Sequence, residues 1–168
     1  QIQRELMNKA IRGEKLGITQ QNIAVGRIYG TVYRKPNVNY SKAVLLVHCL
    51  STNRYAFGVL AERLVEYGIL CLSIDLPSHY LNPNTFTLGE VSETITAGVL
   101  LIKKGLGIQR VAVIAHSIAA IGALFSNAGY NKEIEITLYG LWERIARLIA
   151  QQTAVVEGAS LTSKQVTE

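Results

Sequence analysis

Short apolar runs alternate with amphipathic segments along most of this chain. Three runs, at residues 43–47, 69–74 and 111–115, are almost continuously apolar. Such runs are typical of strands that are buried on both faces of a parallel sheet. A fourth short strand is expected at residues 134–138, and a hairpin punctuated by glycine is expected at residues 23–33.

Helices are expected between and beyond these strands, because apolar residues there recur at helical spacing. One helix begins after Thr87, and Glu90 three residues later completes the pattern of a capping box. Gly105 is placed to end this helix. The predicted helices cover residues 1–16, 54–67, 87–104, 119–127 and 142–152.

The alternation of strands and helices predicts an α/β fold, a three-layer α/β/α sandwich around a mostly parallel sheet. A length of 168 residues suits a single domain with a sizeable core. Within this domain, residues 1–168, we expect the core at 18–140, a terminal helix at 141–157 and a frayed tail at 158–168.

Composition and charge exclude several classes of protein. Apolar residues make up 49% of the chain and charged residues 17%, which is incompatible with a largely disordered protein. The net charge of +5 comes from scattered lysines and arginines without interleaved aromatics, so we expect no nucleic-acid partner. No apolar run reaches the ~18 residues of a membrane span, and the polar start does not resemble a signal peptide.

The two cysteines, Cys49 and Cys71, fall at or inside predicted buried strands. Two are too few for a disulfide framework, so we expect reduced thiols in an intracellular, cytoplasmic protein. The first residue is Gln1 rather than Met, which is compatible with a piece of a longer chain. The three histidines and the single aspartate, Asp75, show no metal-ligand spacing, so neither a metal nor a cofactor is expected.

The third apolar run ends at His116 and Ser117, and a segment compatible with a helix follows at once. Strand, serine and helix in this order are the layout of a nucleophile elbow, in which the serine oxygen is exposed on a tight turn. A serine hydroxyl needs a general base to take its proton. The chain has no histidine after His116, so the usual base is not found downstream of Ser117.

Over residues 18–140 the chain resembles the α/β-hydrolase superfamily, because four signals occur in the order that this family shows. They are a glycine-punctuated β unit ending in Arg34-Lys35-Pro36, then His48-Cys49-Leu50 (similar to His-Gly), Asp75-Leu76-Pro77-Ser78-His79 (similar to Asp-x-x-Gly-His-Gly) and Ala115-His116-Ser117-Ile118-Ala119 (similar to Gly-His-Ser-x-Gly). The sequence departs from the family pattern where glycines are replaced, by Cys49, Ser78, Tyr80, Ala115 and Ala119.

The resemblance implies roles for several of these residues. Ser117 is the expected nucleophile, and the backbone N–H groups of Leu50 and Ile118 are the expected oxyanion hole. His79 lies in a loop at the same edge of the sheet as Ser117, so it is a candidate stand-in base. Structural roles near the site are expected for His48, Asp75 and His116.

Two functions from different classes follow. The first is a serine hydrolase that acts on a carboxylic ester, thioester or amide through an acyl-enzyme on Ser117. The second is a non-catalytic, degenerate or truncated hydrolase scaffold that binds a ligand or a protein partner. No later strand is predicted beyond residues 134–138, so the terminal helix is expected to cover part of this edge. Otherwise we expect a homo-oligomer or a second chain that completes the sheet.

Overall fold

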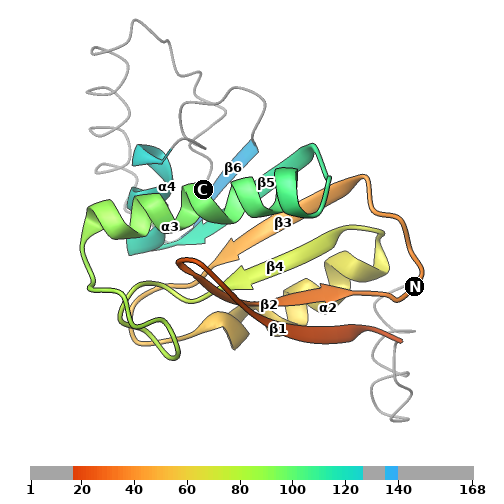
Figure 1. Ribbon diagram of the computed structural model, residues 1–168, viewed down its shortest axis with the longest axis horizontal. Helices are drawn as coiled ribbons and strands as arrows, with labels where there is room; N and C mark the ends of the chain where they lie inside the picture. Colours follow the sequence, from red (N-terminus) through yellow and green to blue (C-terminus); the bar gives the residue numbers. More distant parts are fainter. Residues whose placement is uncertain (1–16, 127–134, 140–168) are drawn as a thin grey trace, which may run out of the picture.

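The computed structural model describes residues 17–126 and 135–139. These residues hold one six-stranded sheet in the order β1-β2-β4-β3-β5-β6 (Figure 1). Strands β3 to β6 are parallel to one another, whereas β2 is antiparallel to both of its neighbours. The strands are β1 Thr19–Val25, β2 Ile28–Arg34, β3 Lys42–Val47, β4 Leu70–Ile74, β5 Arg110–His116 and β6 Glu135–Tyr139.

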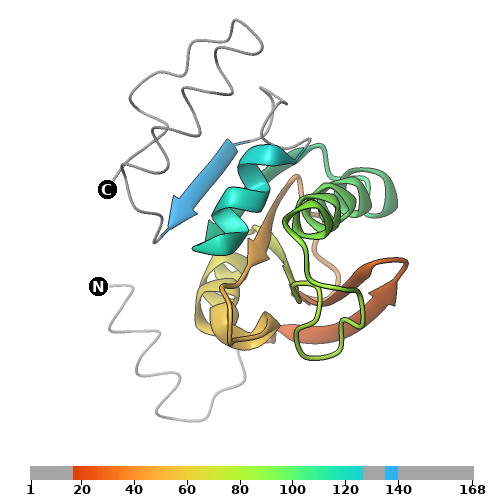
Figure 2. The ribbon, with the colours of Figure 1, turned by 90° about the vertical axis from the view of Figure 1, so that its left-hand side faces the viewer.

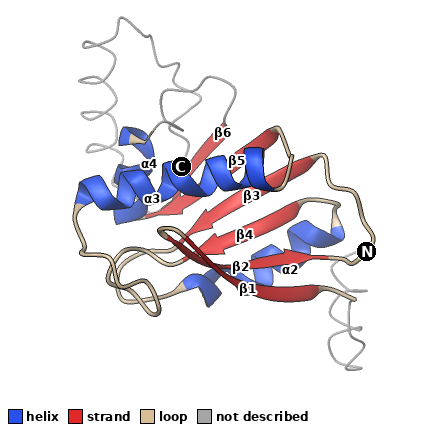
Figure 3. Cartoon of the chain, viewed as in Figure 1, coloured by secondary structure: helices blue, strands red, loops and turns tan. Residues whose placement is uncertain are grey.

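Helices cover both faces of the sheet, as the side view in Figure 2 shows. They are the 3₁₀ turn η1 Arg54–Phe57, α2 Gly58–Glu66, α3 Leu88–Leu100, the π turn η2 Leu101–Gly105 and α4 Ile118–Phe125 (Figure 3). Helix α2 buries Ala61 and Val65 against one face of the sheet. Helices α3 and α4 pack together on the opposite face. The predicted three-layer α/β/α arrangement with a mostly parallel sheet is therefore confirmed.

The central strands explain why the apolar runs were continuous. All five residues of β4 are buried, as are the last five of β3, because helices cover both sides of these strands. In β5 buried and half-buried positions alternate instead. The hairpin, the four strands and the three connecting helices lie where the pattern of the sequence predicts them, with shifts of a few residues at their ends.

Two details of the helices differ from the prediction. The helix expected over residues 54–67 begins as a 3₁₀ turn, because Arg54 is drawn into the interior while Asn53 caps the backbone N–H of Tyr55. Only half of the capping box forms: Thr87 accepts from the N–H of Glu90 at 3.0 Å, but the Glu90 carboxylate pairs with Arg27 at 3.2 Å.

Several predictions concern parts of the chain outside the described residues. These are the helix at residues 1–16, the terminal helix within 141–157 and the tail at 158–168. Strand β6 is one edge of the described sheet, but what lies against that edge is not among the described residues. Association through it stays a prediction.

Candidate active site

The carboxyl ends of three parallel strands meet at one edge of the sheet. Val47, the last residue of β3, is paired with Ile74 of β4 on one side and with Ala115 of β5 on the other. The chain passes from β3 to β4 on one side and later returns to β5 on the other side. In open α/β sheets, ligands bind outside the carboxyl ends of the strands at such a switch point.

Ser117 lies directly after β5 and before α4, with φ 58° and ψ −118°. A positive φ is uncommon for a residue other than glycine and costs about 1–3 kcal/mol, so it persists only where the surrounding structure imposes it. The neighbours Ala115 and Ala119 are fully buried, as expected where a strand and a helix approach closely around a turn. Ser117 therefore lies on a tight turn between a strand and a helix, and its role as a nucleophile stays a prediction.

The Ser117 side chain makes no capping hydrogen bond to α4, although serine at a helix N-terminus commonly does so. The residue is half-buried. Helix α4 packs so closely on α3 at Gly122 that a Cβ added there would lie 2.4 Å from the Val91 side chain. Packing, rather than a serine cap, holds the helix that follows the candidate nucleophile.

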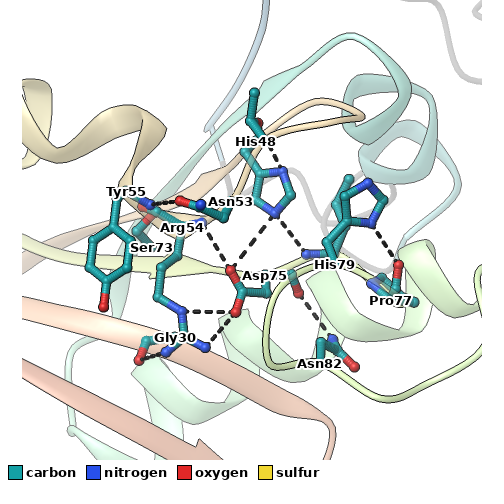
Figure 4. Close-up of polar contacts among 12 residues, drawn as sticks. Gly30, His48, Asn53, Arg54, Tyr55, Ser73, Asp75, Pro77, His79 and Asn82 are labelled. Atoms are coloured by element: carbon teal, nitrogen blue, oxygen red, sulfur yellow. Dashed lines mark hydrogen bonds and ion pairs between the residues drawn. The ribbon is translucent and has the colours of Figure 1, made fainter.

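His48, the first residue after β3, is fully buried. Its Nδ1 lies 2.7 Å from the Cys49 carbonyl oxygen, to which it donates, and its Nε2 accepts from the N–H of Leu76 at 3.0 Å (Figure 4). Burial lowers the pKa of His48, and its two partners fit the neutral ring. The 4.0 Å separation between its Nε2 and Asp75 is therefore not an ion pair.

Asp75, the residue after β4, forms a buried ion pair with Arg54. Asp75 Oδ2 accepts from Arg54 Nε at 2.8 Å and also from Nη2, while Oδ1 accepts from the Arg54 backbone N–H at 2.9 Å. Arg54 Nη1 donates to the Gly30 carbonyl at 2.6 Å, and Asn82 donates to the Asp75 carbonyl at 3.0 Å (Figure 4). Asp75 thus orders the loops around it.

Two positions where the family carries glycine keep a glycine-like backbone here. Ser78 has φ 58° and Tyr80 has φ 49°. The Ser78 hydroxyl accepts from the N–H of Phe86 at 3.1 Å and donates to the Asn84 carbonyl at 2.9 Å. The Tyr80 ring lies 5.3 Å from the Arg54 guanidinium. Local contacts therefore hold both residues in their strained backbone conformations.

His79 is half-buried in the same loop. Its Nδ1 donates to the Pro77 carbonyl at 2.8 Å. Its ring stands edge-on to His48 at 5.3 Å between centroids and lies 5.8 Å from Phe86. Among the residues that the structure describes, no hydrogen bond joins His79 to Ser117. Its role as a base stays a prediction.

Sequence reasoning missed Arg54 as the partner of Asp75. Local pattern gives no signal for this pair, because Arg54 and Asp75 are 21 residues apart in the sequence. Leu50, whose N–H is a candidate oxyanion donor, is 48% exposed. Both cysteines are free thiols, and Cys71 is buried.

Residues 17–126 and 135–139 contain no cluster of three or more histidine, cysteine, aspartate or glutamate side chains that suits a metal ion. No helix in these ranges is long and apolar enough to cross a membrane.

Solved structures with the same arrangement identify the fold. A dienelactone hydrolase of Anabaena variabilis matches with a TM-score of 0.63 and 17% identity, over 79% of this chain and 68% of that protein. The chain has the α/β-hydrolase fold. A cold-adapted esterase from an Arctic intertidal metagenomic library matches at 0.61 and 21% identity, over 83% of this chain and 70% of that one.

An esterase of Pyrococcus furiosus matches this hydrolase fold at a TM-score of 0.56 and 22% identity, over 70% of this chain and 49% of that protein. The chain thus spans between about half and 70% of the length of these three proteins. No protein-family model matches the sequence, and a comparison with curated proteins gives no match.

Proposed function

We propose that this chain carries the nucleophile and oxyanion portion of a serine hydrolase that acts on a carboxylic ester, thioester or amide. The observation that carries the proposal is the backbone of Ser117, which holds a positive φ at the junction of β5 and α4. Non-glycine residues with a positive φ cluster at functional sites, and Ser51, Ser78 and Tyr80 also have a positive φ. Ser117 differs from these three because it joins a strand to a helix beside the switch point of the sheet. The similar structures include two esterases and a dienelactone hydrolase, which supports an ester substrate.

In this mechanism Ser117 Oγ attacks the substrate carbonyl carbon while a general base takes its proton. The carbonyl electron pair moves to the oxygen, whose negative charge accepts hydrogen bonds from the N–H groups of Leu50 and Ile118. Collapse of the tetrahedral intermediate expels the alcohol, thiol or amine, which receives the proton. Water then releases the acyl group by the same steps.

The base has two candidate sources. All three histidines of the chain come before or next to Ser117, and His48 is occupied by its two backbone partners. His79 is the first candidate: its Nδ1 donates to the Pro77 carbonyl, which leaves Nε2 to take the proton once the ring is within reach of Ser117. The other source is a histidine outside these 168 residues, on a further segment or a second chain.

A fluorophosphonate probe tests both the nucleophile and the source of the base. Intact mass is measured after treatment of the wild-type chain, Ser117→Ala and His79→Gln. A single adduct that disappears in Ser117→Ala supports the hydrolase. If His79→Gln also abolishes the adduct, His79 is the base, whereas an unchanged adduct places the base elsewhere.

The alternative function is a non-catalytic scaffold that binds a ligand or a protein partner. The absence of a histidine after Ser117 in this sequence favours it. A folded wild-type chain that gives no adduct, alone or with imidazole added as an external base, would support the scaffold and overturn the hydrolase.

A further inference from the structure

The segment between β3 and η1, residues 48–53, is here called the β3 loop. It contains Leu50, the candidate oxyanion donor, and Ser51, which has φ 64°. Both ends of this loop are attached to the same short segment, Asp75 and Leu76, which follows β4. The attachment at each end is buried and specific.

At its start the loop is held through His48, whose Nε2 accepts from the N–H of Leu76 at 3.0 Å. Within the loop, Thr52 Oγ1 lies 3.2 Å from His48 Nδ1 and donates to the Cys49 carbonyl at 3.1 Å. These contacts tie Thr52, in the second half of the loop, to His48 and Cys49 at its start.

At its end the loop is held through Arg54, which is 1% exposed. Both its guanidinium and its backbone N–H donate to Asp75, and its carbonyl accepts from the Ser73 hydroxyl at 2.5 Å. The guanidinium also donates to the Gly30 carbonyl of β2 at 2.6 Å. Gly30 lies close against β4, since a Cβ at this position would be 2.6 Å from the Ser73 carbonyl. Main chain and side chain of Arg54 are thus both fixed.

A buried ion pair of this kind is a poor choice for stability alone. Desolvation of two charges offsets most of their attraction, and apolar side chains of similar volume often stabilise a protein as well or better. The pair has a second property: its hydrogen bonds have fixed directions, so they select one backbone path for the residues around it.

We propose that Arg54 is a positioning residue which, through its pair with Asp75, sets the conformation of the β3 loop and thereby the direction of the Leu50 N–H. The assignment of the Leu50 N–H to the oxyanion hole rests on the proposed hydrolase function. The control of the loop conformation by Arg54 does not depend on that function, so each of these two claims can fail separately.

The two cysteines provide a readout of the loop that needs no catalytic activity. Cys49 lies in the β3 loop and is half-buried, with its Sγ 3.8 Å from Thr52 Oγ1. Cys71 lies fully buried in β4, and burial raises its pKa to about 12. Alkylation of Cys49 therefore reports on opening of the loop, and alkylation of Cys71 reports on unfolding of the whole sheet.

The experiment uses the 168-residue chain and the variant Arg54→Lys, treated with iodoacetamide and analysed by peptide mass spectrometry. Lysine keeps the positive charge beside Asp75 but cannot reproduce the fork of hydrogen bonds. Arg27→Lys is the matched control, since the Arg27–Glu90 pair is 38% exposed on both side chains. We expect Arg54→Lys to raise the Cys49 rate about tenfold through local opening, with the Cys71 rate unchanged.

An unchanged alkylation rate of Cys49 in Arg54→Lys would overturn the proposal. An equal rise in the alkylation rates of Cys49 and Cys71 would also overturn it, because it would mean that the whole sheet is destabilised. A second readout tests the oxyanion assignment. The rate of fluorophosphonate labelling at Ser117 is expected to fall about tenfold in Arg54→Lys, less than the roughly 10²–10³-fold loss when one oxyanion donor is removed, because the N–H is misdirected and not deleted. If the wild-type chain is not labelled, the proposed hydrolase fails while the thiol rates still decide the role of Arg54.

Discussion

Two hydroxyl residues stand at the starts of two packed helices, and they behave in opposite ways. Thr87, before α3, has an extended backbone with φ −141° and caps the N–H of Glu90 at 3.0 Å. Ser117, before α4, has φ 58° and caps nothing in its helix. Thr87 therefore stabilises the fold, whereas Ser117 has a strained backbone and a hydroxyl that does not cap its helix. A strained residue that gives up a stabilising bond is typical of function.

The difference also shows what holds each helix. Helix α3 has both a cap and an apolar face, whereas α4 has only its packing against α3 and the sheet. The close approach at Gly122 and Val91 is the tightest described contact of a glycine position in the chain. The turn at Ser117 is thus imposed from outside by packed neighbours.

The largest expected effect on the free energy of unfolding comes from adding a side chain where α4 and α3 are in closest contact. Gly122→Ala places a Cβ 2.4 Å from the Val91 side chain, so we expect overpacking to cost about 1–3 kcal/mol, more than alanine gains in helix propensity. Urea denaturation measures the loss. Gly89→Ala is the matched control, because its nearest neighbour is an ordinary 3.8 Å away. A Val91→Ala background that does not reduce the cost of Gly122→Ala would contradict this account.

Removing the two hydroxyls tests the comparison directly. Thr87→Ala deletes a cap and is expected to cost about 1 kcal/mol. Ser117→Ala deletes no cap and is expected to leave the free energy of unfolding within about 0.5 kcal/mol of the wild type. Both are measured by urea denaturation at the same pH. Equal losses would mean that the Ser117 hydroxyl stabilises the fold after all.

Acidic pH should lower the free energy of unfolding, because His48 is buried in the folded chain. Burial lowers the pKa of His48 in the folded chain, so below the unfolded value of about 6.5 the unfolded chain binds a proton that the folded chain does not. The contribution of His48 to the free energy of unfolding is constant above that pH. It falls as the pH falls, by at most about 1 kcal/mol between pH 6.5 and 5.5.

The check compares the free energy of unfolding of wild type and His48→Gln across that range. Glutamine keeps an acceptor for the N–H of Leu76, so we expect a smaller pH dependence. His79→Gln is the control and should keep the loss that belongs to His48. An identical pH dependence in His48→Gln and wild type would show that His48 is not the residue responsible.

The smallest expected effect is a gain. Ser117→Gly adopts φ 58° without steric cost, so release of backbone strain should outweigh the larger entropy of the unfolded chain by roughly 0.5 kcal/mol. Thr87→Gly, at an extended position, should lose stability instead. Thermal unfolding of the pair measures both signs, and a loss in Ser117→Gly would show that the turn is not strained.

Much of the fold could be predicted from local pattern. The runs at 43–47 and 69–74 predicted buried strands because sheets covered on both faces need continuous apolar sequence. The Ser117 turn could be predicted because a strand, a serine between small residues and a helix are consecutive in the chain. Such features depend on residues close in sequence, so one chain is enough to detect them.

The ion pair of Arg54 and Asp75 could not be predicted in this way, since its partners are 21 residues apart and lie on loops of different strands. The glycine-like backbone at Ser78 and Tyr80 was hidden for the same reason: neither side chain favours it, and contacts with Phe86, Asn84 and Arg54 impose it. Propensity describes what a residue prefers alone, and here distant neighbours decide.

The sequence by itself therefore determined the order of strands and helices, the candidate nucleophile Ser117 and the absence of a histidine beyond it. Only the tertiary structure decided that β3, β4 and β5 end side by side, that His48 is neutral and occupied by its backbone partners, and that Arg54 ties the β3 loop to Asp75. The physical reason is that hydrophobic periodicity acts within a segment, whereas burial of charge requires partners that only the folded sheet brings together.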